Sequence, residues 1–265
     1  ETDAIKAVED NLFDAWKFLS AIPNVDYQRG PKVIRYISGV PFPLCNSIMR
    51  ANFSPEDADR ETRDAMIPFK TRRLPMFWWV GPATRPADLG KVLEREGLRL
   101  ADCVPCMAAD LSATTAAAGS AGPDAPDLTV REVQDDMTLG QWMDVFREGF
   151  EMPADPADFF GNAMRHIGFH PDMAYRHYVG LWKDRPVACS SVYLGDGAAG
   201  IYNVATLAAF RGRGLGAAMT LRPMRVAGER GIGTAILHAT EMGVPLYRKL
   251  GFSKCCELSL YLWEP

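Results

Sequence analysis

The sequence predicts a two-domain α/β (α+β) protein, in which a mixed, mostly antiparallel twisted sheet is flanked by helices. Its 265 residues are 48% hydrophobic and 23% charged, which is enough apolar material for two cores. A run of small residues with two prolines and no apolar period begins after residue 112. We therefore expect one domain over residues 1–112, a linker over 113–127 and a second domain over 128–265.

The second half alternates strand and helix patterns along the chain. Amphipathic spacing predicts the helices, alternating or buried apolar runs predict the strands, and Gly-rich or charged pairs mark turns. Pro245 suits the first turn of a helix, and Gly231 and Gly251 suit helix ends. The expected elements are strand 128–133, helices 138–150 and 158–166, strands 175–182, 186–194 and 199–206, helix 217–230, strand 234–239, helix 245–251 and strand 253–263.

Strands 175–182, 186–194 and 199–206 are expected to form an antiparallel meander, and a glycine-rich loop separates the last of them from the following helix. Gly212, Gly214 and Gly216 leave backbone amides unobstructed at the start of a helix, while Arg211 and Arg213 add positive charge. Helix N-termini with free amides bind anions, so the loop suits a pyrophosphate.

These residues resemble the GNAT superfamily of N-acetyltransferases. The Arg/Gln-x-x-Gly-x-Gly/Ala signature of the family matches Arg211, Gly214 and Gly216, and its later Tyr-x-x-x-Gly-Phe matches the segment from Tyr247 to Phe252. The resemblance covers about half of the chain and implies an acyltransferase that binds acetyl-CoA. The coenzyme-binding residues it implies are the strand end Val204, Ala205 and Thr206, with the loop and first helical turn Arg211, Gly212, Arg213, Gly214, Leu215, Gly216 and Ala217.

Acetyl transfer to an amine needs a proton donor for the departing thiolate and a way to deprotonate the amine. The resemblance assigns the donor to Tyr247, whose phenol is protonated at neutral pH. Many relatives carry a glutamate before the coenzyme-pairing segment, but Gly200 stands at that position. His238 and Glu241 are the candidate bases, and ordered water without a single base stays open as an alternative.

The acceptor pocket of the family forms mostly at the junction of the first two helices. Phe150 and Glu151 lie there, and Asn203 is a third candidate contact. An apolar surface with acidic groups suits the primary amine of a small molecule or peptide. A solvated acidic loop is the plainer interpretation of the same residues.

The first half resembles a second, degenerate GNAT-like domain, because it repeats the end of the same pattern in weakened form. A strand over 77–80, a helix from about residue 86 and a strand over 100–111 match the elements from residue 234 onward. The segment 53–60, ahead of its long helix, is acidic and has no glycine loop, and Leu93 stands where the tyrosine would be. An acidic helix start repels a pyrophosphate, so we expect this domain not to bind coenzyme A.

Composition limits the partners. A net charge of -4 without a basic cluster argues against nucleic acid, and no apolar run is long enough to span a membrane. The polar first residues do not indicate a signal peptide, so we expect a cytoplasmic location. We expect no metal: Cys103 and Cys106 could form a redox or half zinc site, but an apolar run without a second pair favours buried thiols. The oligomeric state stays open, with a homodimer as one option.

Two other classes of function compete with this interpretation. The glycines also satisfy a dinucleotide fingerprint, but too few residues follow them for a Rossmann domain, and the Gly-Lys-Ser/Thr of a P-loop is missing. A non-catalytic acyl-CoA sensor or scaffold is the stronger alternative. Retention of Tyr247 favours an enzyme, because binding alone needs no proton donor.

Overall fold

The computed structural model describes residues 2–112, 127–170 and 172–265, so the predicted linker 113–127 lies outside the described residues except for Asp127. The described helices are α1 (Thr2–Leu19), α2 (Ala58–Arg72), α3 (Leu89–Arg95), α5 (Asp136–Gly149), α6 (Ala154–Ile167), α7 (Leu215–Glu229) and α8 (Val244–Lys249), with short 3₁₀ turns η1 (Pro43–Cys45) and η2 (Ala208–Phe210). The strands are β1 (Asp26–Arg29), β2 (Ile34–Ile37), β3 (Asn46–Met49), β4 (Met76–Val80), β5 (Arg99–Asp110), β6 (Leu128–Glu132), β7 (Tyr175–Trp182), β8 (Arg185–Leu194), β9 (Ala199–Thr206), β10 (Thr234–His238) and β11 (Ser253–Trp263).

The chain forms two compact units, and each takes residues from both halves of the sequence. Unit 1 comprises residues 1–15 and 106–255, and unit 2 comprises residues 16–105 and 256–265. The predicted domains 1–112 and 128–265 follow chain order, whereas the units change over within β5 and within β11. The last part of β5 pairs with β10 in unit 1, and the last part of β11 pairs with β4 in unit 2.

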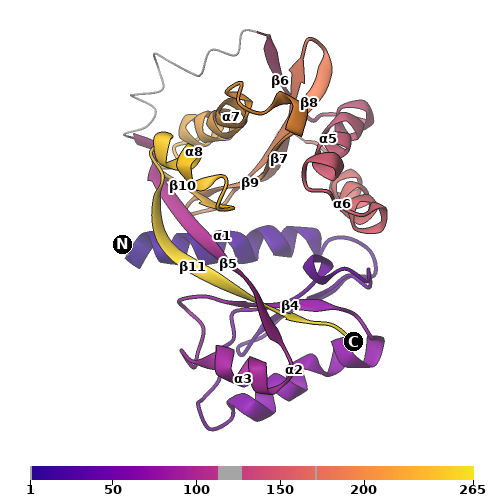
Figure 1. The fold of residues 1–265 in the computed structure, drawn as a ribbon, viewed down its shortest axis with the longest axis vertical. Coiled ribbons are helices and arrows are strands. Elements are labelled where there is room, and N and C mark those ends of the chain that lie inside the picture. Colours follow the sequence, from indigo (N-terminus) through magenta and orange to yellow (C-terminus); the bar gives the residue numbers. More distant parts are fainter. Residues whose placement is uncertain (1, 113–126, 171) are drawn as a thin grey trace. The chain divides into compact units, whose positions relative to one another are not determined.

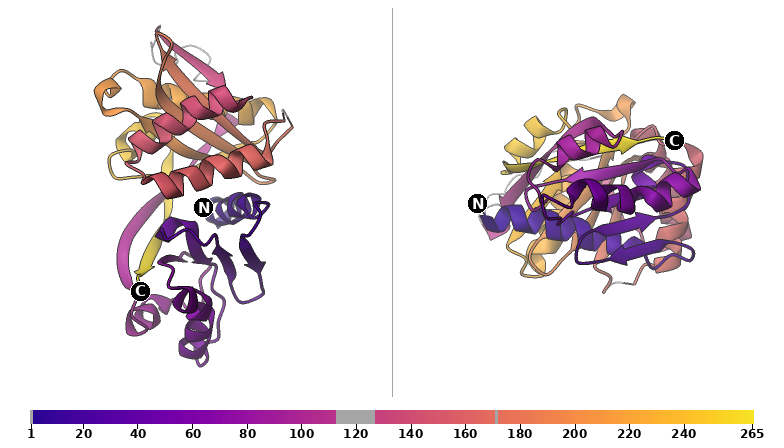
Figure 2. Two further views of the ribbon diagram at one scale, coloured as in Figure 1. Left: turned by 90° about the vertical axis from the view of Figure 1, so that its right-hand side faces the viewer. Right: turned by 90° about the horizontal axis from the view of Figure 1, so that it is seen from below.

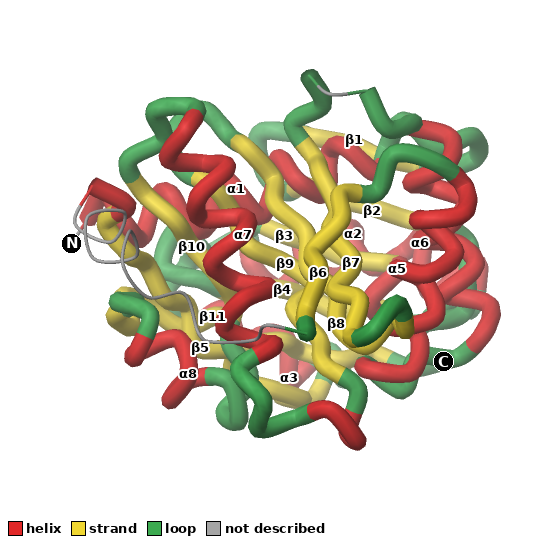
Figure 3. The backbone as a smooth tube through the Cα atoms, turned by 90° about the horizontal axis from the view of Figure 1, so that it is seen from above, coloured by secondary structure: helices red, strands yellow, loops and turns green. Residues whose placement is uncertain are grey.

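Unit 1 is a six-stranded sheet with helices on both faces. Its strand order is β5-β10-β9-β8-β7-β6, and only the β9–β10 pair is parallel. Helices α5 and α6 cover one face and α7 and α8 the other (Figure 1), and the left view of Figure 2 looks onto the α5–α6 face. Figure 3 shows the strands as the middle layer between α7 and the α5–α6 pair. The mixed, mostly antiparallel sheet that the sequence predicted is confirmed.

Local sequence explains how these helices begin and where they are buried. The carboxylate of Asp135 accepts a hydrogen bond from the Thr138 amide, and the Asp135 amide donates to the hydroxyl oxygen of Thr138, which closes a capping box at the start of α5. The apolar stripe of α5 then buries Trp142 and Phe146, whose rings stack 4.8 Å apart. The indole of Trp142 donates to Ser190 O, which fixes α5 on β8.

Unit 2 repeats the second part of unit 1, as the sequence predicted. Its strand order is β1-β2-β3-β4-β11, with β3 and β4 parallel. The parallel pair is connected by α2, as α7 connects β9 to β10, and α3 and β5 then follow as α8 and β11 follow β10. The predicted strand 77–80 lies within β4, and the helix expected from about residue 86 begins at Leu89.

Cys103 is not the buried thiol that the sequence predicted. It is exposed, whereas Cys106 is buried. An odd spacing places two strand residues on opposite faces, which explains the difference. Among the described residues no group of three or more His, Cys, Asp or Glu side chains is arranged to hold a metal ion. The described helices include none with the length and apolar character needed to cross a bilayer.

Candidate active site

The two parallel strands of unit 1, β9 and β10, pair over a short stretch and then part. We call the place where they part, after Ile201 and Leu237, the fork. Strand β9 pairs with β10 only at Ala199, Gly200 and Ile201. Beyond that point, within the part of the chain that the structure describes, β9 pairs with β8 alone, through Tyr202, Ala205 and Thr206. The edge of β9 that faces away from β8 is therefore open for an extended ligand. The predicted residues Val204, Ala205 and Thr206 form this open edge.

A β-bulge lies at the base of the open edge. The register between β8 and β9 shifts between Cys189 and Ser191, so that Asn203 and Val204 of β9 stand opposite the single residue Ser190 of β8. Asn203 adopts a φ of 55°, and its carbonyl oxygen accepts the thiol of Cys189 at 3.3 Å. The bulge bends the strand where it parts from β10.

The predicted glycine turn follows the open edge and leads into α7. Gly212 and Gly214 have φ angles of 77° and 76°, a region that side-chain-bearing residues avoid. Gly214 is the N-cap of α7 and brings no side-chain acceptor to the first-turn amides. These amides are therefore free to donate to an anion. Leu215 and Ala217 are buried behind the turn, and Gly216 lies close to α8, where an added Cβ would be 3.2 Å from Leu246 Cδ2.

The two arginines of the turn are held differently. Arg211 is exposed, and its Nε donates to Thr206 O at 3.2 Å, which ties the turn to the end of β9. Arg213 lies over the rings of Trp182 and Phe210, at 5.5 and 5.8 Å from their centroids. Both keep a positive charge near the open amides.

Tyr247 lies on α8, the helix that follows β10. Its side chain is only 8% exposed, and burial raises the pKa of the phenol to about 12. Gly243 makes room for the ring, because a Cβ there would be 2.7 Å from Tyr247 Cε2. Gly251, with a φ of 91°, lets the chain turn so that the Phe252 amide donates to Tyr247 O at 3.0 Å. At neutral pH the phenol is a proton donor.

Unit 2 has the same turn without the phenol. Gly97 also has a φ of 91°, and the Leu98 amide donates to Leu93 O at 2.9 Å. Leu93 is therefore the structural counterpart of Tyr247, as the repeat between the two halves of the sequence predicted.

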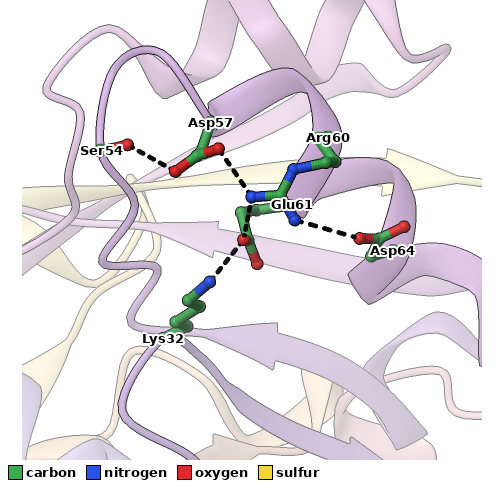
Figure 4. Close-up of polar contacts among 6 residues, drawn as sticks. All are labelled: Lys32, Ser54, Asp57, Arg60, Glu61 and Asp64. Atoms are coloured by element: carbon green, nitrogen blue, oxygen red, sulfur yellow. Dashed lines mark hydrogen bonds and ion pairs between the residues drawn. The ribbon is translucent and has the colours of Figure 1, made fainter.

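The start of α2 also differs from the start of α7. Figure 4 shows a network of charged groups at this position in unit 2. Arg60 bridges Asp57 and Glu61 at 2.6 and 3.0 Å, and Lys32 reaches Glu61. Hydrogen bonds from Arg60 and Ser54 lower the pKa of Asp57, so this carboxylate keeps its negative charge near the helix start.

His238 is the last residue of β10, at the point where the fork opens. Its ring stacks on Tyr202, with centroids 5.9 Å apart and an interplanar angle of 19°. The Nε2 atom is buried and has no hydrogen-bond partner among the described residues. Burial lowers the pKa of the imidazole to about 4, so it is neutral at pH 7 and only weakly basic. Glu241, the other candidate base, is exposed in the turn after β10.

A buried polar row crosses β7, β8 and β9 on the face that α5 covers. His177 Nδ1 lies 2.7 Å from Ser191 Oγ, which also accepts Asn203 Nδ2 at 3.2 Å. Asn203 was predicted as an acceptor contact, and the structure places it in this row. His177 and Ser191 were not predicted from the sequence. Alternation along the two strands was the available signal, but it does not say which residues of neighbouring strands are opposite.

The predicted acceptor residues Phe150 and Glu151 lie at the end of α5. Gly149 lets this end approach β9 closely, since a Cβ there would be 2.8 Å from Ala205 Cβ. Phe150 is 42% exposed. Glu151 lines a surface hollow of about 530 Å³ together with Arg185 of β8 and Leu207, the residue after the open edge.

Comparison with known proteins agrees with this geometry. Residues 139–252 match the model of the acetyltransferase (GNAT) family. A GCN5-related N-acetyltransferase from Kribbella flavida is similar in structure, with a TM-score of 0.70, 16% identity and coverage of 97% of this chain and 96% of that chain. One from Sphaerobacter thermophilus gives a TM-score of 0.62 at 14% identity, covering 98% and 90%.

A tandem GNAT protein from the clavulanic acid biosynthesis pathway is also similar, with a TM-score of 0.61, 14% identity and coverage of 98% of this chain and 95% of that chain. At these identities the structural likeness establishes the fold. No curated protein matches the sequence at a significant level.

Proposed function

We propose that this chain, whose residues 139–252 match the model of the GNAT family of acetyltransferases, transfers an acetyl group from acetyl-CoA to a primary amine of a small molecule or peptide. The match agrees with the resemblance drawn from the glycine and tyrosine motifs. The observation that carries the proposal is the open edge of β9 running directly into a turn with free amides. The proposal includes a cytoplasmic location and leaves the oligomeric state open.

The open edge and the turn fit the two polar parts of the acyl donor. An extended pantetheine arm carries amide groups that can pair with the backbone of residues 202–206. The pyrophosphate carries negative charge that suits the amides after Gly212 and Gly214 and the side chain of Arg211. Bound acetyl-CoA supplies a thioester that is reactive toward amines.

Two side chains of unit 1 would handle the protons. Tyr247 would donate its phenolic proton to the sulfur as the carbon–sulfur bond breaks. His238 is the candidate to accept the proton of the attacking amine, because its Nε2 lies at the base of the fork and has no partner among the described residues, whereas Glu241 is exposed. Direct attack by the bound amine then needs no covalent intermediate on the protein.

Unit 2 would not hold a second acyl donor. The start of α2 carries Asp57, Asp59 and Glu61, which oppose the negative charge of a pyrophosphate. Arg60 and Lys32 are already engaged by these acids (Figure 4). Because Leu93 replaces the phenol, unit 2 also lacks a proton donor at the position of Tyr247.

Release of free thiol from acetyl-CoA, measured with a panel of primary amines, tests the proposal. We expect turnover with at least one amine and a loss of about 10²–10⁴-fold in kcat for Tyr247→Phe. Tyr178→Phe is the matched control, because the Tyr178 phenol is also buried, with its pKa raised to about 12 by burial, and lies outside the fork. Coenzyme binding without turnover would favour the sensor alternative, and equal turnover in the two variants would remove Tyr247 as the acid.

A further inference from the structure

Asn11 of α1 is a buried polar side chain, and both polar atoms of its amide form hydrogen bonds with residues of unit 1. It is 4% exposed, its Nδ2 donates to Ala198 O at 2.7 Å, and its Oδ1 accepts the hydroxyl of Tyr202 at 2.7 Å. A backbone carbonyl can accept only from the amide nitrogen, so the contact with Ala198 fixes the orientation of the amide. Asn11 therefore presents an acceptor, and not a donor, to Tyr202.

Gly200 of β9 leaves the space that the contact between Asn11 and Tyr202 occupies. Gly200 lies two residues before Tyr202 on β9, and a Cβ at this position would be 1.9 Å from Asn11 Oδ1 and 2.4 Å from Tyr202 Cε2. No side chain larger than hydrogen leaves room for both groups. The glycine that replaces the expected glutamate thus has a positive role, because it lets the amide of α1 reach the tyrosine.

The hydroxyl of Tyr202 is held as a donor. Burial raises the pKa of Tyr202 well above its usual value, so the phenol keeps its proton. The hydrogen bond to Asn11 fixes the position of the hydroxyl end of the ring, and His238 stacks on that ring. The contacts run from Asn11 through Tyr202 to the imidazole whose Nε2 has no partner among the described residues.

We propose that Asn11 is a positioning residue for acetyl transfer, which fixes the ring of Tyr202 and through it holds His238 at the base of the fork. This inference rests on the proposed function, in which the proton of the attacking amine passes to His238 Nε2 and the proton of Tyr247 passes to the departing sulfur. Asn11 itself touches neither substrate. Its role is to keep the imidazole in the one orientation that leaves Nε2 available.

Steady-state kinetics of four variants test this role. Asn11→Leu keeps the branched shape of the side chain and removes both hydrogen bonds, Tyr202→Phe removes the hydroxyl, and the double variant removes both partners. Asn11→Asp keeps an acceptor oxygen for Tyr202. We expect Asn11→Leu and Tyr202→Phe each to lower kcat about tenfold while the KM for acetyl-CoA stays within twofold. The double variant should be no slower than the slower single variant, and Asn11→Asp should recover part of the rate.

A second readout does not depend on turnover. The nitrogen and carbon-bound proton resonances of the His238 ring should shift in Asn11→Leu and in Tyr202→Phe, and return toward the wild-type positions in Asn11→Asp. If wild-type protein turns over no amine but these resonances shift, the proposed function fails while the contact from Asn11 to His238 stands. If wild-type protein is active but the resonances and kcat of Tyr202→Phe are unchanged, or the losses multiply in the double variant, the positioning role is overturned. Tyr202→Phe carries this outcome even if Asn11→Leu does not fold.

Discussion

Two glycines that flank α7 allow the anion-binding role of the turn to be separated from its backbone strain. Gly212 lies in the turn before the helix and Gly231 lies just after its end, and both have a φ of 77°. An added Cβ meets no atom within 4 Å at either position. Gly212→Ala and Gly231→Ala therefore impose the same conformational penalty without a clash, and only one of them lies beside the open amides.

The expected magnitudes follow from this match. A residue with a side chain in the left-handed region costs about 1–2 kcal/mol, and a loss of about 1 kcal/mol lowers the melting temperature of a unit of this size by about 2–4 °C. Both variants should show this shift. Only Gly212→Ala places a methyl group next to the anion site, where a lost hydrogen bond to a charged group is worth about 1.5–3 kcal/mol, or about tenfold to a hundredfold in Kd.

Calorimetric titration with coenzyme A, together with thermal unfolding of both variants, measures the two effects. The titration should give a weaker Kd for Gly212→Ala and an unchanged Kd for Gly231→Ala. Equal Kd values for the two variants, with equal losses of stability, would refute the assignment of the turn as the pyrophosphate site.

Three further outcomes are expected. The pKa of His238 is about 4 in the folded chain and about 6.5 when unfolded, so the unfolded state binds more protons and stability falls as the pH drops below 6.5. Between pH 8 and pH 5, urea unfolding should show wild-type protein losing about 2 kcal/mol more than His238→Asn, and equal losses would contradict the buried neutral imidazole. Asp135→Ala removes the cap of α5 and should lower the free energy of unfolding by about 1 kcal/mol. Met137→Ala, at an exposed position in the first turn of the same helix, is the control and should change the free energy of unfolding little. Glu151→Gln should raise the KM of an amine acceptor about threefold without changing the KM of acetyl-CoA, and an unchanged acceptor KM would remove Glu151 from the acceptor hollow.

The elements around the glycine turn could be predicted because local sequence determines them. Strands β7 to β9 alternate along a meander, and glycines stand where φ must be positive, as at Gly212 and Gly251. The turn shared by Leu93 and Tyr247 was found from sequence for the same reason. Each of these features depends on a few neighbouring residues.

The features that the sequence did not predict depend on distant partners. The four residues of β1, Asp-Tyr-Gln-Arg, are polar and have no alternating pattern, so pairing with β2 makes them a strand. The apolar stripe of α1 indicates a buried face but not which sheet it covers. The contact of Asn11 with Tyr202 spans 191 residues, and no local pattern encodes it.

The changeover of β5 and β11 between the two units has a consequence for biosynthesis. Strand β4 is made early, yet its neighbour β11 is made only after strands β5 to β10 have been synthesised. Until then one edge of β4 exposes unpaired amides and carbonyls, the kind of edge that recruits other chains and chaperones. Separate expression of residues 1–112 would make that vulnerable intermediate permanent.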